Sequence, residues 1–181
     1  MRRDQFEHVI RAAAEVVEDE IVVVGSQAVL GLYPEAPEPL LTSLEVDMFP
    51  RTRPERAAEI DGAIGDGSPF HETWGYYAHG VGPETAIAPA GWEQRLIKME
   101  LPPISRKLET VVAWCLEPHD LVLAKLAAGR PQDRLYTLEA IQAGLVDPER
   151  LRLGIALMPE SHREPTRTRL EGALAEAARA G

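Results

Sequence analysis

The strongest constraint on the fold of this chain is a short β-branched run that ends in glycine and serine. Ile21-Val22-Val23-Val24 predicts a buried strand, because branched side chains of this kind pack well on a pleated surface. Gly25-Ser26 interrupts the run, and Gln27-Ala28-Val29-Leu30 is typical of the first turn of a helix. The residues therefore predict a strand, a tight turn and a helix in immediate succession.

A second strand is predicted over residues 44–48, where apolar and acidic residues alternate. Side chains two residues apart on a strand point to the same face, so Glu45 and Asp47 project together while the three apolar residues face the other side. Two neighbouring carboxylates repel each other unless a cation lies between them, and Mg²⁺ prefers carboxylate oxygens together with substrate phosphates. A magnesium site and a solvated edge strand both stay open on this evidence.

The Gly25-Ser26 turn has the chemistry of a phosphate site. Glycine lets a phosphate approach the backbone, and the start of the following helix presents unpaired N–H groups and the positive end of its dipole. The Ser26 hydroxyl adds a further donor. Serine is also a common helix N-cap, so a purely structural role is the alternative.

The rest of the chain predicts further helices and strands. Apolar residues at helical spacing indicate a helix over residues 3–18, and a proline-rich loop follows the first turn at residues 33–39. Another helix is predicted over residues 53–64, and several strands over residues 70–116. Helices are then predicted at residues 118–128, 132–142, 148–158 and 164–179.

Composition limits the partners and the compartment. The formal net charge of −10 argues against a binder of duplex DNA, because affinity for phosphate backbones comes from Lys and Arg. The single cysteine, Cys115, has no intrachain partner and lies in an apolar run, which favours a buried thiol. No stretch reaches the roughly 18 apolar residues of a membrane-spanning helix, and residues 1–5 lead directly into a polar helical pattern. We therefore expect a cytoplasmic protein with no membrane partner.

A strand ending in Gly-Ser, a helix and a second strand with two acids resemble the nucleotidyltransferase superfamily, which has the polymerase-β-like fold. The resemblance implies that Gly25 and Ser26 hold the triphosphate of an NTP and that Glu45 and Asp47 hold Mg²⁺. Residues 27–44 separate the two motifs, a longer spacing than is usual in the superfamily. The proline-rich loop would therefore be an insertion.

A second resemblance lies downstream, in the segment EPHDLVLAKLAAGRPQD that runs from Glu117 to Asp133. Three further segments belong with it: GSQA at 25–28, FHETWGYY at 70–77 and AGWEQRL at 90–96. Over roughly residues 20–150 the chain is similar to the AbiEii and MenT nucleotidyltransferase toxins. This similarity implies that Lys125 and Asp133 complete the active site, and that tRNA or a cognate toxin or antitoxin protein is the partner.

Lys125 also stands out from its position alone. On a helix over residues 118–128 it falls between Leu121 and Val122, inside the apolar arc. A lysine there either binds an anion or extends its ammonium group to water, and a compact ammonium suits a phosphate. Asp133 lies at the start of the next helix, where capping and the helix dipole are a sufficient explanation. The resemblance instead implies that Asp133 is a base or an orienter of the acceptor group.

A third carboxylate on a neighbouring strand is usual at the metal site of this superfamily. Glu100 is the preferred candidate because it lies in a strand-like stretch, and Glu109 is the alternative. If neither serves, the site keeps two acids and binds one metal ion instead of two. No two histidines have the spacing of zinc ligands with a third ligand nearby, so zinc is not expected.

Two groups of residues have both a structural and a functional interpretation. Packing is preferred over base stacking for the aromatic residues Phe70, Trp74, Tyr76 and Tyr77. A solvated helix face is preferred over RNA contact for Arg150, Arg152, Arg163, Arg167 and Arg169.

We therefore predict an α/β protein of nucleotidyltransferase fold, with a short mixed sheet flanked by helices. Residues 1–116 form the core, and the helical C-terminal part at 117–181 completes the same domain. The expected activity is Mg²⁺-dependent transfer of an NMP from an NTP to a hydroxyl of RNA such as tRNA, of a protein or of a small molecule, in a toxin–antitoxin or phage-defence system. The alternative is a catalytically inactive protein of the same fold that binds a partner protein or a nucleotide as an antitoxin-like or regulatory module.

Overall fold

The chain folds around a five-stranded mixed sheet, which confirms the predicted fold class. A computed structural model describes residues 1–180. The strands are β1 (Ile21–Val23), β2 (Glu45–Pro50), β3 (Tyr77–Gly80), β4 (Ile97–Leu101) and β5 (Val111–Cys115). They lie in the order β3-β2-β1-β5-β4. β1 runs antiparallel to β2 and parallel to β5, β2 and β3 are parallel, and β4 and β5 are antiparallel.

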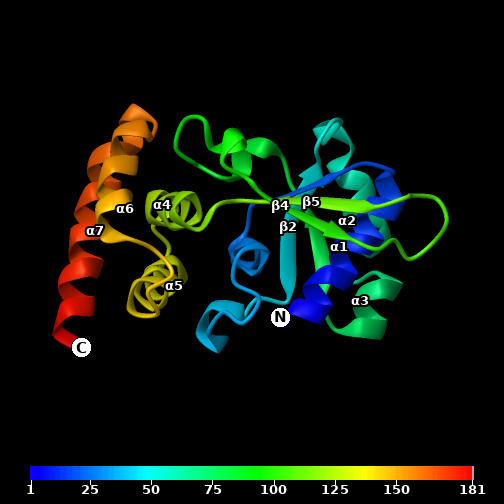
Figure 1. The fold of residues 1–181 in the computed structure, drawn as a ribbon, viewed down its shortest axis with the longest axis horizontal. Helices are drawn as coiled ribbons and strands as arrows, with labels where there is room; N and C mark the ends of the chain where they lie inside the picture. Colours follow the sequence, from blue (N-terminus) through cyan, green and yellow to red (C-terminus); the bar gives the residue numbers. More distant parts are fainter. Residues whose placement is uncertain (181) are drawn as a thin grey trace.

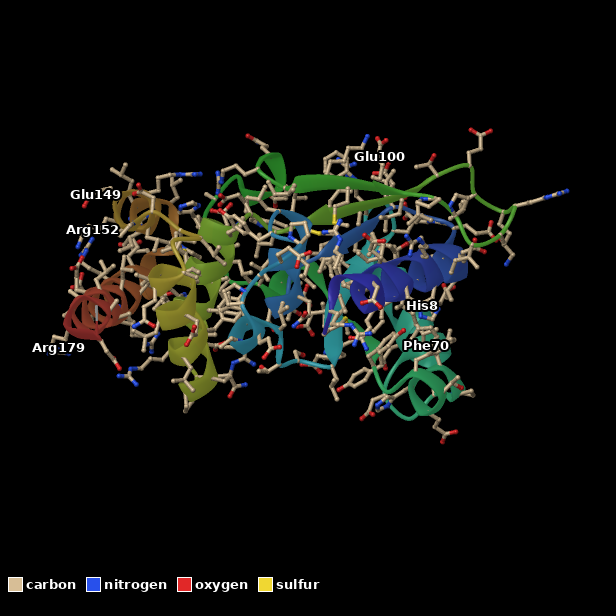
Figure 2. The ribbon with its side chains drawn as sticks, turned by 60° about the horizontal axis from the view of Figure 1, so that its bottom comes forward. His8, Phe70, Glu100, Glu149, Arg152 and Arg179 are labelled. Atoms are coloured by element: carbon tan, nitrogen blue, oxygen red, sulfur yellow. The ribbon has the colours of Figure 1, made fainter. Side chains whose placement is uncertain are left out.

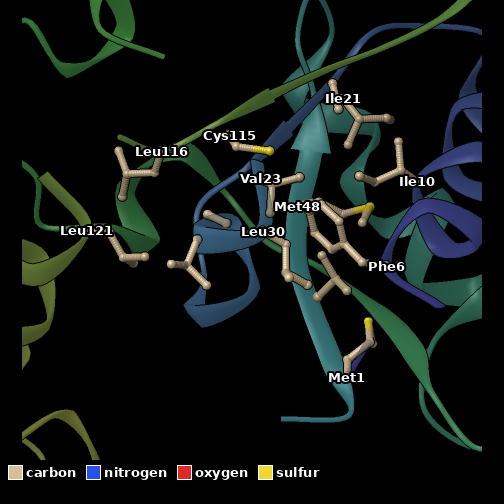
Figure 3. Close-up of a cluster of buried hydrophobic side chains, with 14 of the residues drawn as sticks. Met1, Phe6, Ile10, Ile21, Val23, Leu30, Met48, Cys115, Leu116 and Leu121 are labelled. Carbon is tan, nitrogen blue, oxygen red and sulfur yellow. The ribbon is translucent and has the colours of Figure 1, made fainter. Parts of the chain in front are cut away.

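The central strand β1 is buried on both of its faces. Ile21 and Val23 join the main apolar core, whereas Val22 and Val24 belong to a smaller cluster with Phe49. Alternate residues of a strand face opposite sides, so a run of β-branched residues covers both layers at once. Figure 3 shows part of the main core, with side chains from α1, the sheet and α4 meeting around β1 and β2.

Two helices from the first part of the chain pack against each other and against the sheet. The first, α1 (Arg3–Val17), confirms the helix predicted over residues 3–18, and its buried stripe includes Phe6 and Ile10. The second, α2 (Ala57–Ile64), is preceded by a 3-10 turn, η3 (Pro54–Arg56). The apolar spacing therefore located α1, and the proline and glycine at its two ends located α2.

The segment after β1 is a 3-10 helix, η1 (Ser26–Gly31), rather than the α-helix that the sequence suggests. Gly31 ends it at a crowded position, because a Cβ there would lie 2.5 Å from the Cβ of Cys115. Prolines follow at once, and neither glycine nor proline favours continuation of a helix. A second short 3-10 helix, η2 (Glu38–Leu41), lies within the region predicted as a loop.

Residues 69–74 form a helix, α3 (Pro69–Trp74), where we expect a strand. The Ser68 hydroxyl accepts a hydrogen bond from the backbone N–H of His71, and Gly75 ends the helix with a φ of 73°. Serine at the N-cap with proline at the first helical position is a start signal that outweighs the aromatic content of the segment. Two 3-10 turns, η4 (Pro83–Thr85) and η5 (Trp92–Gln94), then connect β3 to β4.

The last part of the chain is helical, as predicted. It comprises α4 (Pro118–Ala128), α5 (Pro131–Gln142), α6 (Pro148–Gly154), the 3-10 turn η6 (Ile155–Leu157) and α7 (Glu160–Ala180). Figure 1 shows these helices gathered at one end of the molecule, with the sheet and α1 to α3 at the other. α4 lies between them and contacts η1 as well as the other helices of its group. Among the described residues, no helix combines the length and the apolar character needed to cross a membrane.

Candidate active site

The two acids of β2 lie on the same face of the sheet, as their spacing predicts. Glu45 and Asp47 are half-buried, whereas Val46 and Met48 are fully buried in the main core. Leu44, which the alternation assigns to the buried side, instead precedes the strand and is exposed. Alternation within β2 therefore aims both carboxylates away from the main core.

The neighbouring strand β3 adds a histidine to this pair. In the parallel register of β2 and β3, Asp47 lies opposite His79 and Glu45 lies opposite Tyr77. His79 Nδ1 is 2.9 Å from Asp47 Oδ1, and the Tyr77 hydroxyl donates a 3.1 Å hydrogen bond to Glu45 Oε2. Burial, together with the adjacent Glu45 charge, raises the pKa of Tyr77 to about 12, so its hydroxyl stays a donor at neutral pH.

The three side chains can converge on one divalent cation. One ligand atom from each of Glu45, Asp47 and His79 lies within 4.8 Å of the others. Two ligands at right angles, each about 2.1 Å from an ion, lie about 3 Å apart, which matches the Asp47–His79 separation. Two carboxylates and an imidazole are ordinary ligands of divalent metals. The residues present therefore fit the metal that the nucleotidyltransferase resemblance implies.

Gly25 brings the turn after β1 directly against these acids. A Cβ at this position would lie 2.1 Å from Asp47 Oδ2, far closer than real Cβ contacts. The backbone N–H of Val24 also donates a 3.0 Å hydrogen bond to the carbonyl oxygen of Asp47. Glycine is thus required at this turn by close approach to a side chain, and the turn and the carboxylates form one continuous surface.

Ser26 begins η1 immediately after this turn and lines the same cleft as the acids. Peptide dipoles add along a helix, so six residues of 3-10 helix supply less positive potential than the predicted α-helix would. The carbonyl oxygen of Ser26 accepts a 3.0 Å hydrogen bond from the hydroxyl of Tyr136 on α5. The turn is therefore tied to the helical part of the chain.

Lys125 of α4 faces this cleft and does not extend into water. Its side chain is 11% exposed, and its ammonium nitrogen lies 3.2 Å from Asp133 Oδ1. The same nitrogen lies 4.5 Å from the ring centre of Tyr136, within the range of a cation–π contact. Snorkelling, the structural alternative for this lysine, is excluded by these contacts.

Asp133 is held by two cations and by the backbone. Its side chain is 1% exposed, and its second oxygen accepts a 2.8 Å bond from Arg130 Nε and a 3.3 Å bond from the Arg130 backbone N–H. The bond from the Arg130 backbone N–H caps the start of α5, which is the structural role considered for Asp133. With both oxygens engaged and little access from the cleft, Asp133 is better suited to orient Lys125 than to accept a proton.

Arg130 is a residue of this site that the sequence analysis does not single out. It lines the cleft beside Lys125. Its bond to Asp133 raises the pKa of its guanidinium, and the charges of Asp47 and Glu45 act in the same direction across the cleft. A second cation therefore faces the two acids.

The cleft encloses a volume of about 830 Å³ between the sheet and helices α4 and α5. Its lining includes Gly25, Ser26, Glu45, Asp47, His79, Lys125, Arg130 and Asp133. Glu45, Asp47 and His79 come from the sheet, whereas Lys125, Arg130 and Asp133 come from the helical part. A metal-bound anion of the size of a nucleotide could be held between the two walls.

Glu100, the preferred third carboxylate, is not brought to this cleft. It lies on β4, at the opposite edge of the sheet from β3, and its carboxylate pairs with Lys98 at 2.5 Å. Figure 2 shows Glu100 on that outer strand. Glu109 precedes β5, whose far end leads to α4, so it lies away from the cleft as well. Strand-like sequence alone does not reveal the order of strands, and the neighbour of β2 is β3, which carries His79.

The aromatic residues after Gly65 pack against α1, which agrees with the preferred interpretation. His8 of α1 contacts the rings of Phe70, Trp74 and Tyr76 at centre-to-centre distances of 5.1, 4.8 and 5.9 Å. Figure 2 shows His8 and Phe70 together at the end of the molecule remote from α6 and α7. These three rings do not line the cleft.

The C-terminal arginines make contacts within the chain rather than lining the cleft. Arg152 pairs with Glu149 and Glu171, and Arg167 pairs with Glu164. The other three contact the Glu117 carboxylate (Arg150), the Met158 carbonyl (Arg163) and the Leu126 and Ala127 carbonyls (Arg169). Intramolecular pairing on helix surfaces agrees with the solvated-face interpretation of this segment.

The mixed sheet, the glycine turn after β1 and the two acids on β2 define a protein of the nucleotidyltransferase fold. A family model described as "Nucleotidyltransferase of unknown function (DUF6036)" matches residues 4–161. The match covers most of the chain, and the chain belongs to this family. No curated protein and no solved structure matches it.

Proposed function

We propose that the protein is a metal-dependent nucleotidyltransferase that moves an NMP from an NTP to a hydroxyl acceptor. The observation that carries this proposal is that one cleft has the two β2 acids on one wall and two cations on the other. Glu45 and Asp47 face it from β2 beside the Gly25 turn, and Lys125 and Arg130 face it from the helical part. A triphosphate bridging a metal ion and two cations would fit this charge pattern.

Each group of residues would have a different role in the transfer. Glu45 and Asp47 would hold Mg²⁺, which neutralises charge that develops on the phosphates. Gly25 and Ser26 would contact the triphosphate, and Lys125, oriented by Asp133, would bind its oxygens as a point charge. The acceptor oxygen would bond to the α-phosphorus as the bond to the β-phosphate oxygen breaks. Pyrophosphate would leave, and the proton of the acceptor hydroxyl would pass to solvent water.

The charged residues that line the cleft indicate which class of acceptor it favours. Five acids line it, namely Glu45, Asp47, Asp133, Glu139 and Glu176, against the two cations Lys125 and Arg130. Apart from Lys125 and Arg130, which would face the triphosphate, the lining has no cluster of Lys and Arg of the kind that binds a nucleic-acid backbone. The lining therefore favours a small-molecule or protein hydroxyl. The AbiEii and MenT resemblance supports the other option, a tRNA acceptor in a toxin–antitoxin or phage-defence system.

The test is transfer of label from each of the four α-³²P-labelled NTPs, with Mg²⁺ or Mn²⁺, to three acceptor pools: total RNA, cell protein and small metabolites. We expect a labelled product with the wild type and its loss in Asp47→Asn. Glu100→Gln is the matched control, because it removes an exposed carboxylate on the outer strand β4. The labelled pool identifies the acceptor class.

Absence of label with every nucleotide, metal and pool would overturn the enzyme proposal. Thermal unfolding with NTP and metal then separates the remaining explanations, because a ligand of the native state raises the melting temperature. A shift without transfer would indicate the inactive, nucleotide-binding module, and no shift would indicate a module that binds a partner protein.

A further inference from the structure

We propose that His79 is the third ligand of the metal held by Glu45 and Asp47, and that this imidazole makes the site prefer a first-row transition ion over Mg²⁺. The inference rests on the proposed function and deepens it. It concerns which divalent ion the site selects, and therefore which metal the transfer reaction would use.

The first support is the strand register. β2 and β3 pair in parallel with Asp47 opposite His79, and directly opposed residues of paired strands project to the same face. The position beside the two acids on the adjoining strand is therefore occupied by a histidine. The two candidate carboxylates, Glu100 and Glu109, do not line the cleft.

The second support is geometry. His79 Nδ1 lies 2.9 Å from Asp47 Oδ1, and the three ligand atoms lie within 4.8 Å of one another. The His79 side chain is 51% exposed, so the ring is accessible and no core packing explains its place. Gly25 leaves no side chain in front of Asp47, which keeps the approach to the acids open.

The third support is ligand chemistry. Sites built from carboxylate and water oxygens suit Mg²⁺, whereas imidazole nitrogen suits transition ions such as Fe²⁺ and Ni²⁺, whose affinity rises in that order. Replacing one oxygen ligand by a nitrogen ligand therefore shifts preference away from Mg²⁺. Two acids and one histidine keep an open coordination position for a phosphate oxygen.

The competing explanation is a hydrogen bond from His79 to Asp47 with no metal bound. His79→Asn separates the two roles, because an amide N–H can still donate to Asp47 but its nitrogen does not coordinate metal. His79→Asp restores an all-oxygen set. His162→Asn, on α7, is the matched control for removal of a histidine that does not line the cleft.

The experiment measures Mn²⁺ binding by EPR, with competition by Mg²⁺, and detects directly coordinated nitrogen by electron spin echo modulation. We expect nitrogen coupling in the wild type and in His162→Asn, and its loss in both His79 variants. The ratio of Mn²⁺ affinity to Mg²⁺ affinity should be higher in the wild type than in His79→Asp, because the aspartate replaces the imidazole nitrogen by an oxygen ligand. Thermal unfolding of each variant confirms that it is folded.

Mn²⁺ that binds without nitrogen coupling, or with coupling that persists in His79→Asn, would overturn the inference. So would an unchanged Mn²⁺/Mg²⁺ ratio in His79→Asp. Label transfer supported by Mg²⁺ in the same samples would then leave the proposed function standing. Failure to bind either ion, with or without NTP, would overturn both proposals.

Discussion

The hydroxyl group of Tyr136 donates a 3.0 Å hydrogen bond to the backbone carbonyl oxygen of Ser26. Tyr136 belongs to α5 and Ser26 follows β1, so this bond joins the two walls of the cleft. The same ring lies 4.5 Å from the Lys125 ammonium. Burial raises the pKa of Tyr136, which keeps its hydroxyl a donor at neutral pH. One side chain thus positions both the turn and the lysine.

Tyr136→Phe should weaken NTP binding and lower stability by about 1 kcal/mol, because it removes the bond to Ser26 but keeps the ring beside Lys125. Tyr33→Phe is the matched control, since the Tyr33 hydroxyl donates a 2.9 Å bond to the Leu145 carbonyl. Urea unfolding should give similar losses for both variants. Only Tyr136→Phe should reduce the melting-temperature shift produced by NTP and metal, and an equal effect of the two would contradict the positioning role.

Gly25→Ala should destabilise the fold and abolish metal binding, because the new methyl group would displace the Asp47 carboxylate. Gly62→Ala provides the contrast. A Cβ at Gly62 meets nothing within 4 Å, and Gly62 lies inside α2, so this change should stabilise the protein by about 0.5–1 kcal/mol. Urea unfolding and Mn²⁺ binding test both variants, and a Gly25→Ala protein with normal metal affinity would refute the close approach.

Asp133→Asn should act through Lys125 rather than through proton transfer. If Asp133 orients the ammonium group, Asp133→Asn and Lys125→Met should each raise the KM for NTP, and the double variant should be little worse than either single one. A general base would instead lower kcat and alter its pH profile. Steady-state kinetics of the three variants decides between these roles.

Arg95 and Asp120 form an ion pair that joins the loop before β4 to the start of α4. Arg95 donates bonds of 2.8 and 3.1 Å to the Asp120 carboxylate, whose side chain is 7% exposed. Burial raises the pKa of Asp120, and Arg95 opposes that effect. Below pH 3.8, the ordinary pKa of an aspartate, Asp120 is protonated in both the folded and the unfolded chain. Above that pH the unfolded chain loses this proton more readily than the folded chain. The free energy of unfolding therefore falls as the pH rises through this range.

Arg95→Met should therefore cost about 3 kcal/mol at pH 8 and less at pH 5, because it leaves a buried carboxylate without its cation. Arg167→Met is the control, since its pair with Glu164 is exposed and should be worth less than about 1 kcal/mol at either pH. Urea unfolding at both pH values measures the difference. An equal loss at pH 5 and pH 8 would mean that packing, not charge, explains the effect.

Cys115 should resist thiol reagents in the folded protein. It is fully buried between Gly31 and Met99, and burial raises the pKa of its thiol from 9.0 to about 12. The unfolded chain loses this proton above pH 9, so the stability that the protonated thiol contributes declines between pH 9 and 12. Cys115→Ala should show a shallower decline, and labelling that is rapid without denaturant at pH 8 would contradict the burial.

Periodicity predicted most of the elements correctly. The helices α1, α4 and α5 and the strands β1 and β2 lie within one or two residues of the predicted bounds, because each has a clear apolar pattern and all but α1 have a glycine or proline near an end. The exceptions are η1, a 3-10 helix where an α-helix is predicted, and α3. The aromatic residues of α3 suggest a strand, but Ser68 and Pro69 start a helix.

Part of the candidate site could also be predicted from the sequence. Gly25, Ser26, Glu45, Asp47, Lys125 and Asp133 all line one cleft. Glu100 does not, and His79 and Arg130 were missed because nothing in their local sequence marks them. A lone histidine on a short strand gains meaning only when its neighbour is known.

The sequence by itself determined the local elements, the direction of the two β2 carboxylates, the burial of Cys115 and the position of Lys125 on an apolar helix face. These depend on residues a few positions apart, whose relation is set by the period of a helix or strand. Only the tertiary structure decided that β3 rather than β4 lies beside β2, that Asp133 engages Lys125, and that Tyr136 reaches Ser26. Strand order and helix docking depend on the packing of the whole core, which no local pattern specifies.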